Sequence, residues 1–155
     1  MESPRYDYLT DGSAIYAESF RIIRAESDLG RFPDDVSKVV VRMIHAAAQT
    51  NLVDDLAWTP GVVASCRAAL LAGAPILCDS TMVATGVIRS RLPRDNDVVC
   101  HLSDPSLVDL ARELNTTKTA AAVELWRDRL EGAVVAIGNA PTSLFRLLEV
   151  VRDRN

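Results

Sequence analysis

Residues 75–79, PILCD, decide the fold class, because they read as a short apolar strand bounded by a proline and a carboxylate. We predict a strand over residues 76–78. Two further apolar runs predict strands over residues 98–102 and 133–137. Helical segments separate the three runs, and short apolar strands alternating with helices indicate a parallel sheet that is covered on both faces. The sequence therefore predicts an α/β fold.

Apolar periodicity and capping residues predict the helices that precede, separate and follow these strands. Three of them precede the first strand. The predicted helices cover residues 11–26, 33–49, 60–72, 82–91, 105–114 and 119–130, and a last helix follows residue 140. Gly73 is predicted to stop the third helix, and Asp104 to cap the fifth.

Loops at the carboxyl ends of parallel strands meet at one edge of the sheet, where ligands bind in such folds. Here these are residues 78–80, 102–104 and 138–140. The Gly138-Asn139 turn could offer backbone N–H groups to an anion. It matches neither a GxGxxG nor a Walker pattern, so a tight structural turn is the simpler interpretation.

Length and composition indicate one domain spanning residues 1–155. The chain has 48% hydrophobic and 25% charged residues, as ordinary globular proteins do. No apolar run approaches the roughly 18 residues of a membrane span, and residues 1–12 lack the pattern of a secretory signal. We therefore expect a cytoplasmic protein that does not bind membranes.

Charge and cysteine content exclude two further classes. The net charge of −4 argues against nucleic acid as the partner, because phosphate backbones select positively charged surfaces. Three cysteines, an odd number, lie among apolar neighbours without CxxC spacing: Cys66, Cys78 and Cys100. This pattern favours reduced buried thiols over disulfides or a zinc site, and we place Cys78 and Cys100 in strands.

The helix predicted over residues 33–49 carries both a core face and a chemical face. Its buried stripe is predicted to contain Val36, Val39, Val40, Met43, Ile44 and Ala47. Lys38, Arg42, His45 and Gln49 fall on an adjoining face. Imidazole titrates near neutral pH, so His45 is a candidate proton donor or acceptor. The plainer interpretation is a hydrogen-bonded structural histidine.

Four long segments carry a family resemblance. They are YDYLTDGSAIYAESFRIIRAESDLGRF, VRMIHAAAQ, GAPILCDSTMVATGVIRSRLP and LWRDRLEGAVVAIGNAPTSLFRLLE. In this order they closely resemble successive segments of the precorrin-8X methylmutase family, over almost the whole chain. The resemblance implies a three-layer flavodoxin-like α/β fold, a homodimer, and an isomerase of cobalamin biosynthesis that needs no metal or other cofactor.

The implied reaction moves a methyl group from C-11 to C-12 in ring C of the corrin macrocycle. It converts precorrin-8X to hydrogenobyrinic acid, or cobalt-precorrin-8 to cobyrinate. The family's proton donor or acceptor falls on His45, and its substrate contacts fall on Arg42 and Ser19. We also expect Tyr16, Asp79, Lys118 and Asn139 to bind substrate.

Several positions depart from the family pattern. Thr81 stands where a carboxylate is usual, Thr85 replaces a histidine, Lys118 replaces an arginine, and HACGQ has become HAAAQ around Ala47 and Ala48. The chain is also shorter than typical members by about a quarter at its C-terminus. Two hypotheses follow: an isomerase, or a catalytically impaired or non-catalytic protein that binds corrinoids or other tetrapyrroles.

Overall fold

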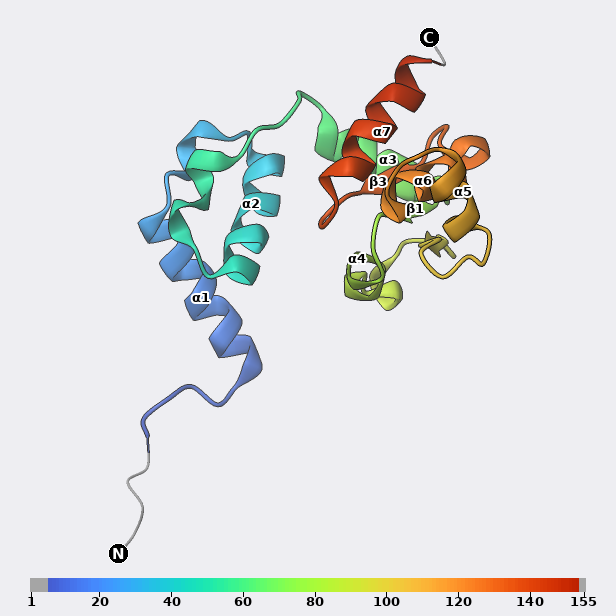
Figure 1. The fold of residues 1–155 in the computed structure, drawn as a ribbon. Coiled ribbons are helices and arrows are strands. Elements are labelled where there is room, and N and C mark those ends of the chain that lie inside the picture. Colours follow the sequence, from blue (N-terminus) through green and yellow to red (C-terminus); the bar gives the residue numbers. More distant parts are fainter. Residues whose placement is uncertain (1–5, 154–155) are drawn as a thin grey trace, which may run out of the picture. The chain divides into compact units, whose positions relative to one another are not determined.

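A computed structural model describes residues 6–153, which form two compact units divided between residues 63 and 64 (Figure 1). The first unit is helical. It contains α1 (Gly12–Glu26), a 3-10 turn (Leu29–Arg31), α2 (Asp34–Ala47) and a second 3-10 segment (Thr50–Asp55). A single domain over residues 1–155 stays a prediction.

Capping and burial explain the two helices of the first unit. The Asp11 side chain accepts a hydrogen bond from the Ala14 N–H at 2.8 Å and so caps α1. Asp34 and Asp35 occupy the first turn of α2, where the helix dipole favours negative charge. The core between these helices is apolar: Ile23, Phe32, Val36, Val40, Val41, Ile44 and Val53.

The predicted stripe on α2 is partly wrong. Val36, Val40 and Ile44 are buried as expected, but Val41 is buried as well. Val39, Met43 and Ala47 are exposed. The periodicity of VSKVVV fits two adjacent stripes, and contact with α1 selects the one that contains Val41. On α1, Ile23 is buried, while Ile15 and Ile22 are exposed.

Helix α2 ends two residues before the predicted boundary, at an alanine in a left-handed conformation. Ala48 has φ 55° and ψ 33°, and its N–H donates to the Ile44 carbonyl at 2.8 Å. Glycine is usual at such a position, because a Cβ crowds the following carbonyl there. The residue that stands at Ala48 in the family pattern HACGQ is indeed glycine.

We expect Ala48→Gly to stabilise the protein by about 0.5–1 kcal/mol, since relief of the left-handed strain exceeds the added entropy of the unfolded chain. Ala46→Gly is the matched control. It lies inside the same helix and is expected to destabilise by about 1 kcal/mol. Urea unfolding of both variants measures the effect. Equal destabilisation by the two substitutions would contradict this account of the Ala48 backbone.

The second unit is built on a three-stranded parallel sheet, which confirms the predicted fold class. Its strands are β1 (Ile76–Cys78), β2 (Val98–Val99) and β3 (Val134–Ala136), in the order β2-β1-β3. In the register, Leu77 lies beside Val99 on one side and Val135 on the other. All three residues of β1 are buried. β2 is shorter than predicted, because the chain turns where the Asp104 N–H donates to the His101 carbonyl.

The helices of the described chain that follow α2 are α3 (Val62–Leu71), α4 (Thr81–Gly86), α5 (Leu107–Glu113), α6 (Lys118–Glu124) and α7 (Pro141–Arg152). Gly73, with φ 86°, follows α3 as predicted. Trp126 is fully buried with Leu77, Val123 and Val150 beside the sheet. The predicted helix 119–130 is shorter than expected. Helix α6 stops at Glu124, and i→i−3 hydrogen bonds form a 3-10 turn over Arg127–Arg129.

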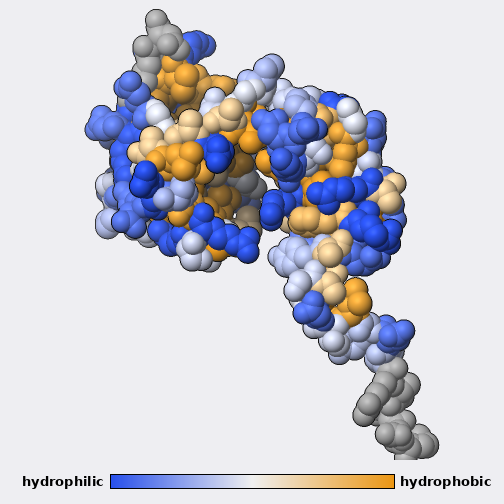
Figure 2. Space-filling view, turned by 180° about the vertical axis from the view of Figure 1, so that it is seen from behind, coloured by the Kyte–Doolittle hydropathy of each residue, from blue (hydrophilic) through white to orange (hydrophobic). Residues whose placement is uncertain are grey.

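The surface of the helices is partly apolar. No helix in the described part of the chain is long and apolar enough to cross a membrane. Apolar side chains nevertheless reach the surface of both units (Figure 2). On α7 they recur along one face, with Leu144, Phe145 and Leu148 between 44% and 65% exposed.

Candidate active site

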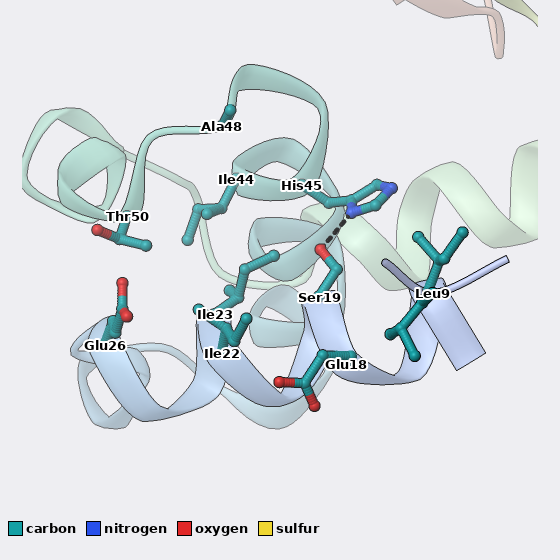
Figure 3. A pocket seen from close by; sticks show the side chains of 11 residues that line it. Leu9, Glu18, Ser19, Ile22, Ile23, Glu26, Ile44, His45, Ala48 and Thr50 are labelled. Atoms are coloured by element: carbon teal, nitrogen blue, oxygen red, sulfur yellow. Dashed lines mark hydrogen bonds between the residues drawn. The ribbon is translucent and has the colours of Figure 1, made fainter. Parts of the chain in front are cut away.

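A short hydrogen bond joins α1 to α2 in the first unit. Ser19 Oγ lies 2.7 Å from His45 Nδ1 (Figure 3). The hydroxyl can donate to a bare Nδ1 or accept from a protonated one, so it can hold the ring in either protonation state. Both side chains are partly buried. His45 Nε2 is the ring nitrogen left for a ligand.

Core packing sets the register that creates this pair. Ile23 lies one turn after Ser19 on α1, and Ile44 immediately precedes His45 on α2. Both isoleucines are buried in the core of the first unit. Sliding one helix along the other would expose apolar side chains, and so their burial holds Ser19 opposite His45.

Aromatic rings surround the imidazole. Tyr16 and His45 have ring centroids 4.9 Å apart with planes at 31°, and Phe20 and His45 have centroids 5.4 Å apart with planes at 80°. The Arg42 guanidinium carbon lies 5.7 Å from the centroid of the Phe20 ring. The structure thus brings Tyr16, Ser19, Arg42 and His45 together, as the sequence predicted.

A pocket of about 660 Å³ lies beside the Ser19–His45 pair (Figure 3). Its lining is largely aliphatic, with a few polar groups, which is the usual make-up of ligand pockets. The lining residues are Leu9, Ile15, Glu18, Ser19, Ile22, Ile23, Glu26, Ile44, His45, Ala48 and Thr50. Two hydrogen bonds from Arg21 lower the pKa of Glu18, so Glu18 lines the pocket as one half of an ion pair.

Asp79 anchors the loop after β3 in the second unit. Its carboxylate accepts hydrogen bonds from the backbone N–H groups of Gly138, Asn139 and Ala140 at 3.2, 2.9 and 2.7 Å. Burial alone would raise the pKa of Asp79, but these bonds and one from Ser80 outweigh it and lower the pKa. The side chain is 1% exposed. This geometry favours loop positioning over direct substrate contact.

The same loop approaches α4 closely. A Cβ on Gly138 would lie 2.7 Å from Val83 Cγ2, which explains glycine at this position. The predicted meeting of residues 78–80 with residues 138–140 at one edge of the sheet is therefore confirmed. Asp79 accepts from the N–H groups of the Gly138-Asn139 turn, which agrees with the simpler interpretation of this turn as a structural one.

The other predicted substrate-binding residues of the second unit are exposed. Asn139 lies within the anchored loop, and Lys118 is the first residue of α6. Three threonine hydroxyls that we did not predict lie next to Lys118. Thr117, Thr119 and Thr142 have Oγ1 atoms 2.9 to 3.1 Å apart, between the starts of α6 and α7. The run TTKT at a helix start was the available signal.

The His45 cluster is equipped for proton transfer and anion binding. A partly buried imidazole held at Nδ1 can give or take a proton at Nε2. An arginine one turn before it on α2 can bind a carboxylate with two parallel hydrogen bonds. An apolar pocket adjoins the imidazole. These are the groups needed to protonate a large, carboxylate-bearing organic molecule.

Comparison with known proteins gives the family. The family model "CbiC: Precorrin-8X methylmutase" matches residues 14–155. A precorrin-8X methylmutase of Sinorhizobium sp is 55% identical over 97% of this chain and 71% of its own length. The Pseudomonas aeruginosa precorrin-8X methylmutase is 55% identical over 94% and 70%. Five relatives named cobalt-precorrin-8 methylmutase are 25% to 30% identical.

A solved structure agrees. The crystal structure of precorrin-8X methylmutase from Thermus thermophilus is 40% identical in sequence and superposes with a TM-score of 0.80, over 92% of this chain and 69% of that one. Two strongly similar sequences, a matching family model and a matching fold lead to the same conclusion. The chain belongs to the precorrin-8X methylmutase family.

Proposed function

We propose that this chain is an isomerase that catalyses the precorrin-8X methylmutase reaction of cobalamin biosynthesis, in which a methyl group moves from C-11 to C-12 of the macrocycle. The observation that carries the proposal is the Ser19–His45 pair beside an apolar pocket, in a chain that is 55% identical to precorrin-8X methylmutases. These relatives are named as enzymes, which favours catalysis over the alternative of a non-catalytic tetrapyrrole binder.

His45 supplies the acid–base chemistry in this proposal. Protonation of the macrocycle draws electrons from the carbon that receives the methyl group and so eases migration. An isomerisation neither gains nor loses atoms, so the proton that His45 gives must return to it within the cycle. Ser19 fits both halves of this cycle, because its hydroxyl can accept from Nδ1–H or donate to Nδ1.

Arg42 orients the substrate in this proposal. The substrate bears many carboxylates, and a guanidinium binds a carboxylate with two parallel hydrogen bonds. Glu26 lines the pocket and would repel carboxylates there, whereas the charge of Glu18 is offset by Arg21. We therefore place the apolar edge of the macrocycle over the pocket and a carboxylate at Arg42. In this placement Tyr16 lies over the macrocycle beside His45. Lys118 and Asn139 remain proposed contacts with the substrate.

Two finer statements belong to the same proposal. The metal-free substrate, precorrin-8X, is favoured over the cobalt form, because the relatives at 55% identity carry the former name. We also propose a homodimer acting in the cytoplasm. The exposed apolar face of α7 supports self-association, since large apolar patches commonly mark protein interfaces.

Gel filtration with the reaction product tests the proposal. Hydrogenobyrinic acid is added to the protein, and the visible spectrum of the eluted protein is recorded together with its mass by light scattering. We expect one product molecule per chain and the mass of a dimer. A folded protein that elutes without pigment would contradict the proposed binding site, and a monomer mass would contradict the homodimer alone.

A further inference from the structure

Phe20 on α1 packs against the core of the first unit and also contacts several of the proposed active-site groups. Its ring lies edge to face against the His45 imidazole, with centroids 5.4 Å apart and planes at 80°. It also lies edge to face against Tyr16, with centroids 5.9 Å apart. Two guanidinium carbons, those of Arg24 and Arg42, lie 5.6 and 5.7 Å from its centroid.

The contact between Phe20 and His45 restricts a rotation of the imidazole ring that the Ser19 hydrogen bond leaves free. One hydrogen bond fixes the position of Nδ1 but leaves the ring free to swing about that atom. Perpendicular contact with Phe20 and tilted contact with Tyr16 restrict the plane of the imidazole. Together these three contacts set the direction in which Nε2 points, which a proton transfer requires to be well aligned.

The contact with Arg42 extends the same control to the second group. A guanidinium over an aromatic face is attracted by the electrons of the ring. Arg42 precedes His45 by three residues, so the two side chains leave α2 on the same face. Phe20, from the other helix, touches both. One side chain therefore orients the proton donor and the carboxylate-binding arginine relative to each other.

We infer that Phe20 is a positioning residue of the methylmutase reaction, holding His45 and Arg42 in the orientation that the substrate needs. The inference rests on the proposed function for its catalytic consequence. The orientation itself is a property of the free protein and can be measured without substrate.

Phe20→Leu is the informative variant, because leucine keeps apolar packing and removes the aromatic face. We expect kcat to fall about 10-fold, since a small misplacement of reacting groups is costly, and KM to rise several-fold through Arg42. Phe20→Tyr keeps the ring and should stay within about threefold of wild type. If the leucine variant fails to fold, Phe20→Met, with its flexible side chain, replaces it.

Phe32→Leu is the matched control. Phe32 lies in the same unit, and Arg31 lies over its ring at 5.5 Å, but its aromatic partner is Trp58 instead of His45. It is buried, so the substitution should lower the melting temperature at least as much as Phe20→Leu. We expect wild-type kcat from the folded Phe32 variant. Loss of kcat in proportion to lost stability in both variants would overturn the inference.

Nuclear magnetic resonance of the two histidine rings gives the independent readout. His101 lies in the second unit and serves as the internal reference. We expect the His45 ring signals and its tautomer ratio to change in Phe20→Leu and to be restored in Phe20→Tyr, with His101 unchanged. Unchanged His45 signals would overturn the inference. A wild-type protein without turnover would contradict the proposed function, while these signals would still decide the orienting role of Phe20.

Discussion

Replacing His45 by alanine is expected to lower kcat by about 10²- to 10⁴-fold, the usual contribution of a positioned general acid or base. The structure gives the physical reason. Nδ1 is held by Ser19 at 2.7 Å, two rings restrict the imidazole plane, and Nε2 remains to exchange a proton with the substrate. Because His45 is only partly buried, the variant should fold and melt close to wild type.

Ser19→Ala tests whether the two residues act as one unit. Alone, it should lower kcat by roughly 10-fold, because the ring loses its anchor at Nδ1. Added to His45→Ala, it should cost little more, since residues that act together are strongly non-additive. Kinetics of the four proteins in this cycle give the coupling. Fully multiplicative losses would show that Ser19 acts independently of His45. A near-normal kcat in His45→Ala would remove His45 from the chemistry.

Asp79→Ala is expected to cause the largest loss of stability, about 3–5 kcal/mol, because it leaves three backbone N–H groups without their charged acceptor in a buried site. Asp104→Ala is the matched control. Asp104 also accepts from a backbone N–H, that of Ser106 at 2.9 Å, but at the surface, so a much smaller loss of stability is expected. Urea unfolding measures both.

The pH dependence of this difference follows from the lowered pKa of Asp79. The folded carboxyl has a pKa below the ordinary aspartate value of about 3.9. Its contribution is therefore complete above that value and is lost as the pH falls through the folded pKa. The gap between wild type and Asp79→Ala should stay constant from about pH 5 to 8 and shrink below about pH 4. A gap that widens on acidification would contradict the assignment.

The sequence predicted those features that depend on local pattern. The parallel sheet follows from three apolar runs separated by helices, and the cluster at His45 follows from the spacing on α2 and the family resemblance. Apolar periodicity could not distinguish Val41 from Val39 and Met43, because both choices form a stripe and only contact with α1 decides between them. Strand β2 was overestimated, since it ends at Val99 and a local turn follows, in which the Asp104 N–H donates to the His101 carbonyl.

Two parts of the candidate site could not be predicted without the three-dimensional structure. Asp79 was expected to bind substrate, but whether a carboxylate faces a ligand or a backbone loop 60 residues away along the chain depends on tertiary structure. Phe20 was overlooked for a different reason. Its i,i+4 spacing from Tyr16 placed the two rings on one face of α1, but nothing in the sequence showed that His45 would lie against them.

Single-turnover conversion of precorrin-8X tests the central claim most directly. Excess protein is mixed with precorrin-8X and the visible spectrum is followed, with His45→Ala measured in parallel under the same conditions. We predict complete conversion to the spectrum of bound hydrogenobyrinic acid by the wild-type protein, and conversion slower by at least about 10²-fold in the variant. Precorrin-8X that binds to the wild-type protein and stays unchanged would contradict the claim and identify a tetrapyrrole binder instead.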